Sequence, residues 1–214
     1  MTEWAGSPRG LLLDAMGTLI GLRQSVGQTY AAAAAEHGLA VEAAAIDQAF
    51  GGIYRSAPPL AFPGLKGAAL LEEERRWWGQ RIDEVLRACG APAGPPQLHR
   101  HLFDRYADPA LWHVYDDVPQ RLQAWHGAGL RLAVVSNFDQ RLHGLLKGLG
   151  LAPWIETVVV SSQAGAAKPS PEPFRQALAA LNLSAAQAWH VGDSPEDVAG
   201  ARAAGLRCLV VRRP

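Results

Sequence analysis

The chain has 214 residues, of which 49% are hydrophobic and 19% charged, and its 20 Lys and Arg residues balance 20 Asp and Glu residues. This apolar fraction excludes an intrinsically disordered chain, and the zero formal charge offers no electrostatic basis for binding nucleic acid or an anionic membrane. Cys89 and Cys208 are too few for a disulfide framework and lie far from any second Cys at metal-binding spacing. The sequence also lacks a secretory signal pattern and a stretch long enough to span a membrane. We therefore expect a cytoplasmic protein, a monomer or weak homodimer, that binds neither nucleic acid nor membrane.

The first predicted element is a buried strand at Gly10–Leu13, which ends in Asp14 and is followed by the turn residue Gly17. A long helical region then extends from about Ser25 to Tyr106. Proline and glycine clusters divide this region at Ala57–Pro59, Phe62–Gly64 and Gly90–Pro96.

Helical and strand patterns alternate from Asp117 to the end of the sequence. The predicted strands are continuously apolar, as is typical of strands that are covered on both faces. The predicted order is helix Pro119–His126, strand Arg131–Ser136, helix Gln140–Leu149, strand Thr157–Ser161, helix Glu172–Leu181, strand Ala188–Val191, helix Glu196–Ala204 and strand Cys208–Val211.

This alternation predicts an α/β fold, a doubly wound parallel sheet of about five strands with helices on both faces. The strand at Gly10–Leu13 must join the same sheet, so the helical region is expected to form an inserted all-helical domain. The predicted division is a core domain at residues 1–22 and 114–214 and a helical cap domain at residues 23–113. The linkers near Gly21–Ser25 and Tyr106–Asp117 are the expected hinges between them.

Polar side chains follow four of the predicted strands. Ligands of such sheets bind beyond the carboxyl ends of the strands, so these side chains are the candidates for function. They are Asp14 after the first strand, Ser136 and Asn137 at the end of the second, Lys168 in the loop after the third, and Asp193 and Asp197 after the fourth.

These four groups resemble, in order, the motifs of the haloacid dehalogenase-like (HAD) hydrolase superfamily. The first is Asp14–Leu19 (DAMGTL), and Ser136-Asn137, Lys168-Pro169 and Gly192-Asp193 with Asp197 follow it. The resemblance covers nearly the whole chain and implies a Rossmannoid core with a helical cap inserted between the first two motifs. The stretches VVSNFDQRL and GAAKPSPEPF most resemble a capped branch of hydrolase-like proteins within this superfamily.

The chemistry of these residues agrees with a phosphatase that acts on a small phosphorylated molecule. The Asp14 carboxylate would attack phosphorus to form an aspartyl-phosphate, which replaces one difficult displacement by two easier ones. Attack on a phosphate dianion needs nearby positive charge, which Mg²⁺ and the Lys168 ammonium would supply. The expected metal ligands are Asp14, the backbone carbonyl of Met16, and Asp193, with Asp197 one layer behind. Ser136 and Asn137 would hydrogen-bond the transferring group, as would Lys168, and Thr18 would hold Asp14 and its turn in place.

Each of these residues also has a purely structural interpretation. An Asp before a glycine often only shapes a turn, Asp139 fits the N-terminus of the next helix better than a catalytic acid, and acids such as Asp197 favour helix starts. Lys168 could be a solvated loop residue. The seven His residues show no metal-ligand spacing and are expected to lie on the surface or in the core, and Trp77, Trp78 and Trp112 are expected in the core of the cap.

The chain departs from the HAD phosphatase pattern at Met16. That position usually carries a second Asp, which protonates the leaving oxygen and then activates water, and methionine can do neither. General acid–base catalysis contributes ~10²–10⁴ in rate, so we expect a weak phosphatase that is best on esters whose leaving group needs no proton.

Two alternatives remain. The 2-haloacid dehalogenases of the superfamily also lack the second Asp and would use Asp14 without metal, although they dispense with the acid that this chain keeps at Asp193. The other alternative is a catalytically impaired protein that binds a phosphorylated ligand in a regulatory role.

Overall fold

The computed structural model describes residues 7–213, and these divide into two compact units. One is an α/β unit made of the described residues within Met1–Gly21, Leu60–Leu65 and His113–Pro214. The other is a helical unit made of Leu22–Pro59 and Lys66–Trp112. None of the helices formed by these residues is long and apolar enough to cross a membrane.

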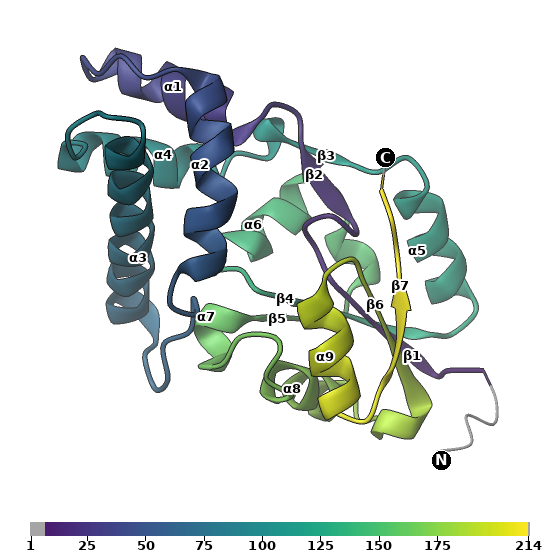
Figure 1. Ribbon diagram of the computed structural model, residues 1–214. Coiled ribbons are helices and arrows are strands. Elements are labelled where there is room, and N and C mark those ends of the chain that lie inside the picture. Colours follow the sequence, from purple (N-terminus) through teal and green to yellow (C-terminus); the bar gives the residue numbers. More distant parts are fainter. Residues whose placement is uncertain (1–6, 214) are drawn as a thin grey trace. The chain divides into compact units, whose positions relative to one another are not determined.

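A five-stranded parallel sheet forms the centre of the α/β unit (Figure 1). Its order is β5-β4-β1-β6-β7, so the first strand in the sequence is central and pairs with strands from the second half of the chain. The predicted parallel α/β sheet is thereby confirmed. The strands are β1 (Gly10–Leu13), β4 (Arg131–Ser136), β5 (Thr157–Val160), β6 (Ala188–Gly192) and β7 (Arg207–Val210).

Helices cover both faces of this sheet, because alternate strand residues point to opposite sides. Leu12 of β1 and Phe174 of α8 belong to one buried apolar cluster, while Leu13 lines a pocket on the other face together with Leu122 of α5. Figure 1 shows α8 and α9 on the near face of the sheet and α5 and α6 behind it. The helices are α5 (Val118–Gly127), α6 (Arg141–Gly148), α7 (Ser161–Ala164), α8 (Glu172–Ala180) and α9 (Pro195–Ala203), with short 3₁₀ turns η2 (Ala152–Trp154) and η3 (Ala185–Gln187).

The helical unit has a core of its own. Ser25 caps the first helix through a reciprocal capping box with Gln28, and Tyr30, Ile82 and Leu98 lie buried in one apolar cluster. The helices of this unit are α1 (Val26–Glu36), α2 (Ala43–Ser56), α3 (Gly67–Ala88) and α4 (Pro96–Arg105), followed by the 3₁₀ turn η1 (Pro109–Leu111).

Three features differ from the expectation. The segment Leu60–Leu65 lies within the predicted cap but packs with the α/β unit, because Ser161 Oγ donates to the Leu60 carbonyl at 2.7 Å and Phe62 N donates to Ser162 O at 3.3 Å. A two-stranded ribbon, β2 (Ile20–Leu22) with β3 (Trp112–Val114), was not predicted. Ser161 begins α7 and does not end β5.

Candidate active site

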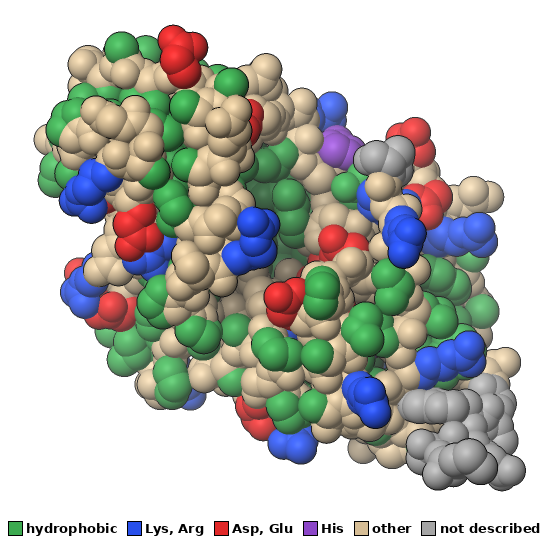
Figure 2. Space-filling view, viewed as in Figure 1, with side chains coloured by type: hydrophobic (Ala, Val, Ile, Leu, Met, Phe, Trp, Pro, Cys, Tyr) green, Lys and Arg blue, Asp and Glu red, His purple; other side chains and the backbone are tan. Residues whose placement is uncertain are grey.

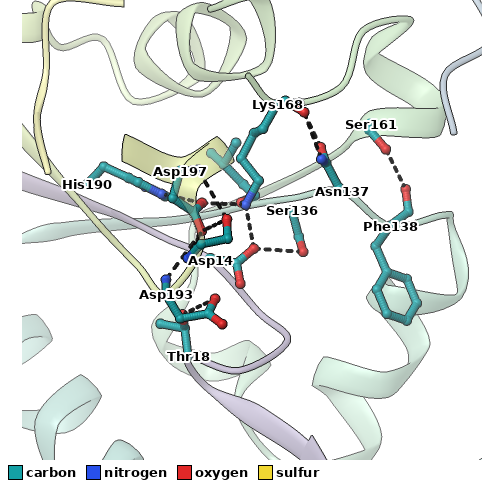
Figure 3. Close-up of polar contacts among 12 residues, drawn as sticks. Asp14, Thr18, Ser136, Asn137, Phe138, Ser161, Lys168, His190, Asp193 and Asp197 are labelled. Atoms are coloured by element: carbon teal, nitrogen blue, oxygen red, sulfur yellow. Dashed lines mark hydrogen bonds and ion pairs between the residues drawn. The ribbon is translucent and has the colours of Figure 1, made fainter. Parts of the chain in front are cut away.

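Three carboxylates meet at the carboxyl edge of the sheet in the α/β unit (Figure 3). Asp14 follows β1 and is buried, Asp193 follows β6 and is exposed, and Asp197 lies buried in the first turn of α9. One oxygen from each lies within 4.8 Å of the others. The sequence prediction that acids from opposite ends of the chain converge is therefore met.

Lys168 joins two of these carboxylates. Its Nζ donates to Asp14 Oδ1 at 2.5 Å, to Asp197 Oδ1 at 2.6 Å and to the Val135 carbonyl at 3.2 Å, which uses all three ammonium hydrogens. The side chain is 5% exposed. Burial alone would lower the pKa of this ammonium, but the two carboxylates outweigh burial and raise it. Lys168 is therefore a buried cation, and the solvated-loop interpretation is wrong.

The two residues at the end of β4 have different tasks. Ser136 Oγ donates to Asp14 Oδ1 at 3.0 Å, so it orients the carboxylate. Asn137 accepts from Lys168 N at 2.7 Å and donates to Lys168 O at 2.9 Å. The expectation that the Asn137 amide faces the transferring group is corrected, because both ends of that amide hold the loop that carries Lys168.

Both carboxylate oxygens of Asp197 accept hydrogen bonds. Its Oδ2 receives Ser194 Oγ at 2.7 Å and the backbone N–H groups of Ser194 and Asp193, and its Oδ1 receives Lys168 and His190. Burial alone would raise the pKa of this carboxyl, but the His190 hydrogen bond and the Lys168 charge lower it below its usual range. The helix-start interpretation holds as well, since Asp197 closes the capping box of α9 with Ser194.

His190 is the residue of this site that sequence reasoning missed. It is fully buried in β6, with Nδ1 2.9 Å from the Leu12 carbonyl and Nε2 2.7 Å from Asp197 Oδ1. Both partners offer acceptor oxygens, so the ring bridges the backbone of β1 and the Asp197 carboxylate. The Phe174 ring packs edge-on against the imidazole at 4.9 Å. The sequence signal that could have identified His190 is that it is a polar residue within a buried, mostly apolar strand, on the same face of that strand as Ala188.

Two glycines leave room for the acids. Gly17 has φ of 77°, and a Cβ on it would collide with the Asp193 carboxylate. A Cβ on Gly192 would collide with Asp197 in the same way. The Thr18 hydroxyl donates to Asp193 Oδ1 at 3.4 Å, so the expected role of Thr18 is corrected: its side chain contacts Asp193 and not the nucleophile candidate.

The donor set fits a hard dication such as Mg²⁺, which prefers carboxylate oxygens. Lys168 and Ser136 engage Oδ1 of Asp14, and Asp193 receives a long contact from Thr18 and a hydrogen bond from its own backbone. Although Asp193 as a residue is exposed, partial burial raises the pKa of its carboxyl, and the charges of Asp14 and Asp197 raise it further. A cation would relieve this repulsion, so Asp14 and Asp193 are the acids suited to ligate it.

Other candidates from the sequence lie apart from this chemistry. Asp139 is buried and accepts from the Arg141 guanidinium at 2.6 and 2.8 Å at the start of α6, which supports its structural interpretation. Trp77 and Trp112 are buried in the helical unit, where Trp77 Nε1 donates to the Pro58 carbonyl. Figure 2 shows acidic and basic side chains interspersed over the described residues of one face, without a broad field of one sign.

Comparison with known proteins agrees with this architecture. The chain is 37% identical over 210 residues to human haloacid dehalogenase-like hydrolase domain-containing protein 3, a match that covers 96% of this chain and 82% of that protein. It is 34% identical over 155 residues to a phosphoserine phosphatase of Thermus thermophilus, which covers 71% of this chain and 60% of that protein. The fold resembles L-2-haloacid dehalogenase from Xanthobacter autotrophicus, with a TM-score of 0.70 at 21% identity over 96% of this chain and 78% of that one. Residues 8–205 match the haloacid dehalogenase-like hydrolase family, and the chain belongs to this family of hydrolases.

Proposed function

We propose that this hydrolase is a Mg²⁺-dependent phosphatase that acts on a small phosphomonoester through an aspartyl-phosphate at Asp14. The observation that carries the proposal is the buried Lys168 ammonium, held between Asp14 and Asp197 beside the open carboxylate of Asp193. This arrangement offers a nucleophile, a fixed cation and a dication site within one cluster. The similarity to a phosphoserine phosphatase supports the same reaction class.

Several side chains of the α/β unit would take part in the first step, the attack of Asp14 on phosphorus. Lys168 and Ser136 engage Oδ1 of Asp14, so Oδ2 is the oxygen that would attack phosphorus. The bond between phosphorus and the leaving oxygen breaks, and the leaving group departs with the electron pair. Asp14, Asp193 and the Met16 carbonyl would hold Mg²⁺, with Asp197 behind them. When bound, the cation neutralises phosphate charge during the attack.

A dehalogenase-type reaction is the second candidate, and Met16 is the observation that favours it. Halide leaves without a proton, so the missing acid would be no handicap, and Asp14 would attack carbon without a metal. Against it stands the Asp193 carboxylate, whose pKa is raised by partial burial and also by repulsion from the charges of Asp14 and Asp197. That repulsion would also oppose a carboxylate substrate, so the phosphatase is the better account.

A panel of phosphate monoesters and 2-haloacids, each assayed with and without EDTA, tests this choice. We expect metal-dependent release of phosphate and no release of halide. Asp14→Asn should reduce phosphate release to the rate without protein, because an amide cannot act as the nucleophile.

Circular dichroism of Asp14→Asn controls for folding. Phosphate release that survives in a folded Asp14→Asn protein would reject the nucleophile, and halide release in EDTA would replace the phosphatase by the dehalogenase. Release of neither phosphate nor halide would favour the catalytically impaired, ligand-binding alternative.

A further inference from the structure

Met16 lies in the turn between Asp14, the proposed nucleophile, and Thr18, and the residue is 41% exposed. A thioether neither gives nor takes a proton at any accessible pH. If Asp14 forms the proposed aspartyl-phosphate, two proton transfers therefore lack a group at this position. The leaving oxygen of the substrate receives no proton, and the water that should later attack phosphorus loses none.

The other titratable groups near Asp14 in the described part of the α/β unit do not replace it. Asp197 has both oxygens engaged by donors, so neither is free to take a proton from water. His190 is fully buried, and both of its ring nitrogens face acceptors. Lys168 already donates all three ammonium hydrogens, to Asp14, Asp197 and the Val135 carbonyl. Asp193 is the acid assigned to the cation.

We propose that Asp14 is a persistent phosphorylation site and that its phosphoryl donors are acyl phosphates. This inference rests on the proposed aspartyl-phosphate chemistry and moves its preferred substrate from phosphate esters, which should react slowly, to mixed anhydrides of phosphoric and carboxylic acids. In the first step an Asp14 oxygen forms a bond to phosphorus, and the bond from phosphorus to the acyl oxygen breaks. The electron pair leaves with a carboxylate, whose conjugate acid has a pKa near ~4, so no proton is needed.

The same step is also favoured by its energy balance. An aspartyl-phosphate is itself an acyl phosphate, so transfer from an acyl phosphate exchanges one such anhydride for another. An ordinary phosphate ester would have to expel an alkoxide, for which the described α/β unit supplies no acid. The second step, attack of water on phosphorus, requires loss of a proton from that water, and this step is the one left slow.

Acetyl phosphate with Mg²⁺ is the probe, and the intact mass of the protein is the readout. We expect the wild-type protein to gain the mass of one phosphoryl group and to keep it after the donor is removed by desalting. Asp14→Asn should gain none. Met16→Asp restores a carboxylate to the turn and should lose the phosphoryl group about 10²–10⁴-fold faster than the wild type.

Val210→Asp is the matched control, since it adds the same charge at a position 55% exposed on the edge strand β7. It should keep the phosphoryl group as long as the wild type does. Phosphoryl loss from Met16→Asp that is no faster than from Val210→Asp would refute the missing-base explanation. Labelling that persists in Asp14→Asn would refute the site.

The proposed function and this inference fail in different ways. If the wild type converts acetyl phosphate to phosphate in an Asp14-dependent reaction but carries no phosphoryl group, persistence is wrong and the hydrolase mechanism stands. If the wild type and Met16→Asp neither gain the group nor release phosphate, both proposals fall. Should Met16→Asp not fold by circular dichroism, the lifetime of the wild-type phosphoryl group alone decides.

Discussion

The imidazole of His190 links the centre of the sheet to the charged cluster at its edge. It spans from the Leu12 carbonyl to Asp197, which in turn receives Lys168. His190→Phe keeps an aromatic ring beside Phe174 but removes both ring nitrogens, so the Leu12 carbonyl and Asp197 each lose a hydrogen-bond partner. We expect the free energy of unfolding to fall by about 1–3 kcal/mol in urea denaturation.

Because Asp197 would then be held less firmly, Lys168 would also be less well placed, and kcat should fall more than KM changes. Trp189→Phe, on the neighbouring position of β6, is the control for disturbance of the strand. Unchanged stability together with unchanged kcat in His190→Phe would show that the ring does not position this cluster.

The sequence was sufficient to find the residues that end strands. Asp14, Ser136, Lys168 and Asp193 were located because chain order and strand pattern bring them to one edge. The partners of individual atoms were not accessible in this way. Whether the amide of Asn137 faces a ligand or the Lys168 backbone depends on the path of a loop 31 residues away.

Among the elements, the loop that carries Lys168 depends on the end of β4. Asn137 binds the backbone of Lys168 on both sides, so Asn137→Ala should release this loop. Loss of the two hydrogen bonds should lower the melting temperature and the free energy of unfolding by about 1–3 kcal/mol. Phosphate release should fall as well, because Lys168 would no longer be held against Asp14.

Asn137→Asp separates the two bonds, since a carboxylate still accepts from Lys168 N but cannot donate to Lys168 O. We expect it to lie between the wild type and Asn137→Ala in a thermal melt. A melting temperature for Asn137→Ala equal to that of the wild type would contradict the assigned role.

Strands of four or more residues were predictable from the sequence, and the three-residue strands were not. The strands β1 and β4 begin and end as predicted, because a buried parallel strand appears as an apolar run bounded by turn residues. The three-residue strands β2 and β3 pair although most of the helical unit lies between them in the sequence. Such short segments show no hydrophobic periodicity. Leu60–Leu65 joins the α/β unit through hydrogen bonds of its own backbone to Ser161 and Ser162, which no hydrophobic periodicity encodes.

At the scale of the whole molecule, the buried charges define a pH range of greatest stability. The pKa of Asp197 is lowered by folding, so its contribution is present above 3.8, the value of the free carboxyl, and is lost as the pH falls through the folded value. The pKa of Lys168 is raised, so its contribution is present below 10.5 and is lost as the pH rises through the folded value. Urea denaturation at a series of pH values should show the free energy of unfolding falling both below and above this pH range.

Asp197→Asn should remove this carboxyl's part of the acid limb and also weaken the alkaline limb, because Asp197 is one of the two carboxylates that raise the pKa of Lys168. Asp193 has the opposite sign, since its raised pKa means that ionisation opposes folding when no cation is bound. Added Mg²⁺ should therefore stabilise the protein more as Asp193 ionises with rising pH. Stability that increases on acidification below 3.8 would contradict the assignment for Asp197.

The central position of β1 affects how the protein folds while the ribosome synthesises it. Asp14 is synthesised before its partners, since Ser136 lies 122 residues later and Lys168 154 residues later. Strand β1 gains its first neighbour only when β4 emerges and its second only when β6 follows. The nascent chain therefore carries an unpaired apolar strand while the residues between β1 and β4 are made, and the candidate site is complete only after Asp197 has been added. Ribosome-bound fragments that end before Asp197 should accordingly be inactive and should depend on chaperones to stay in solution.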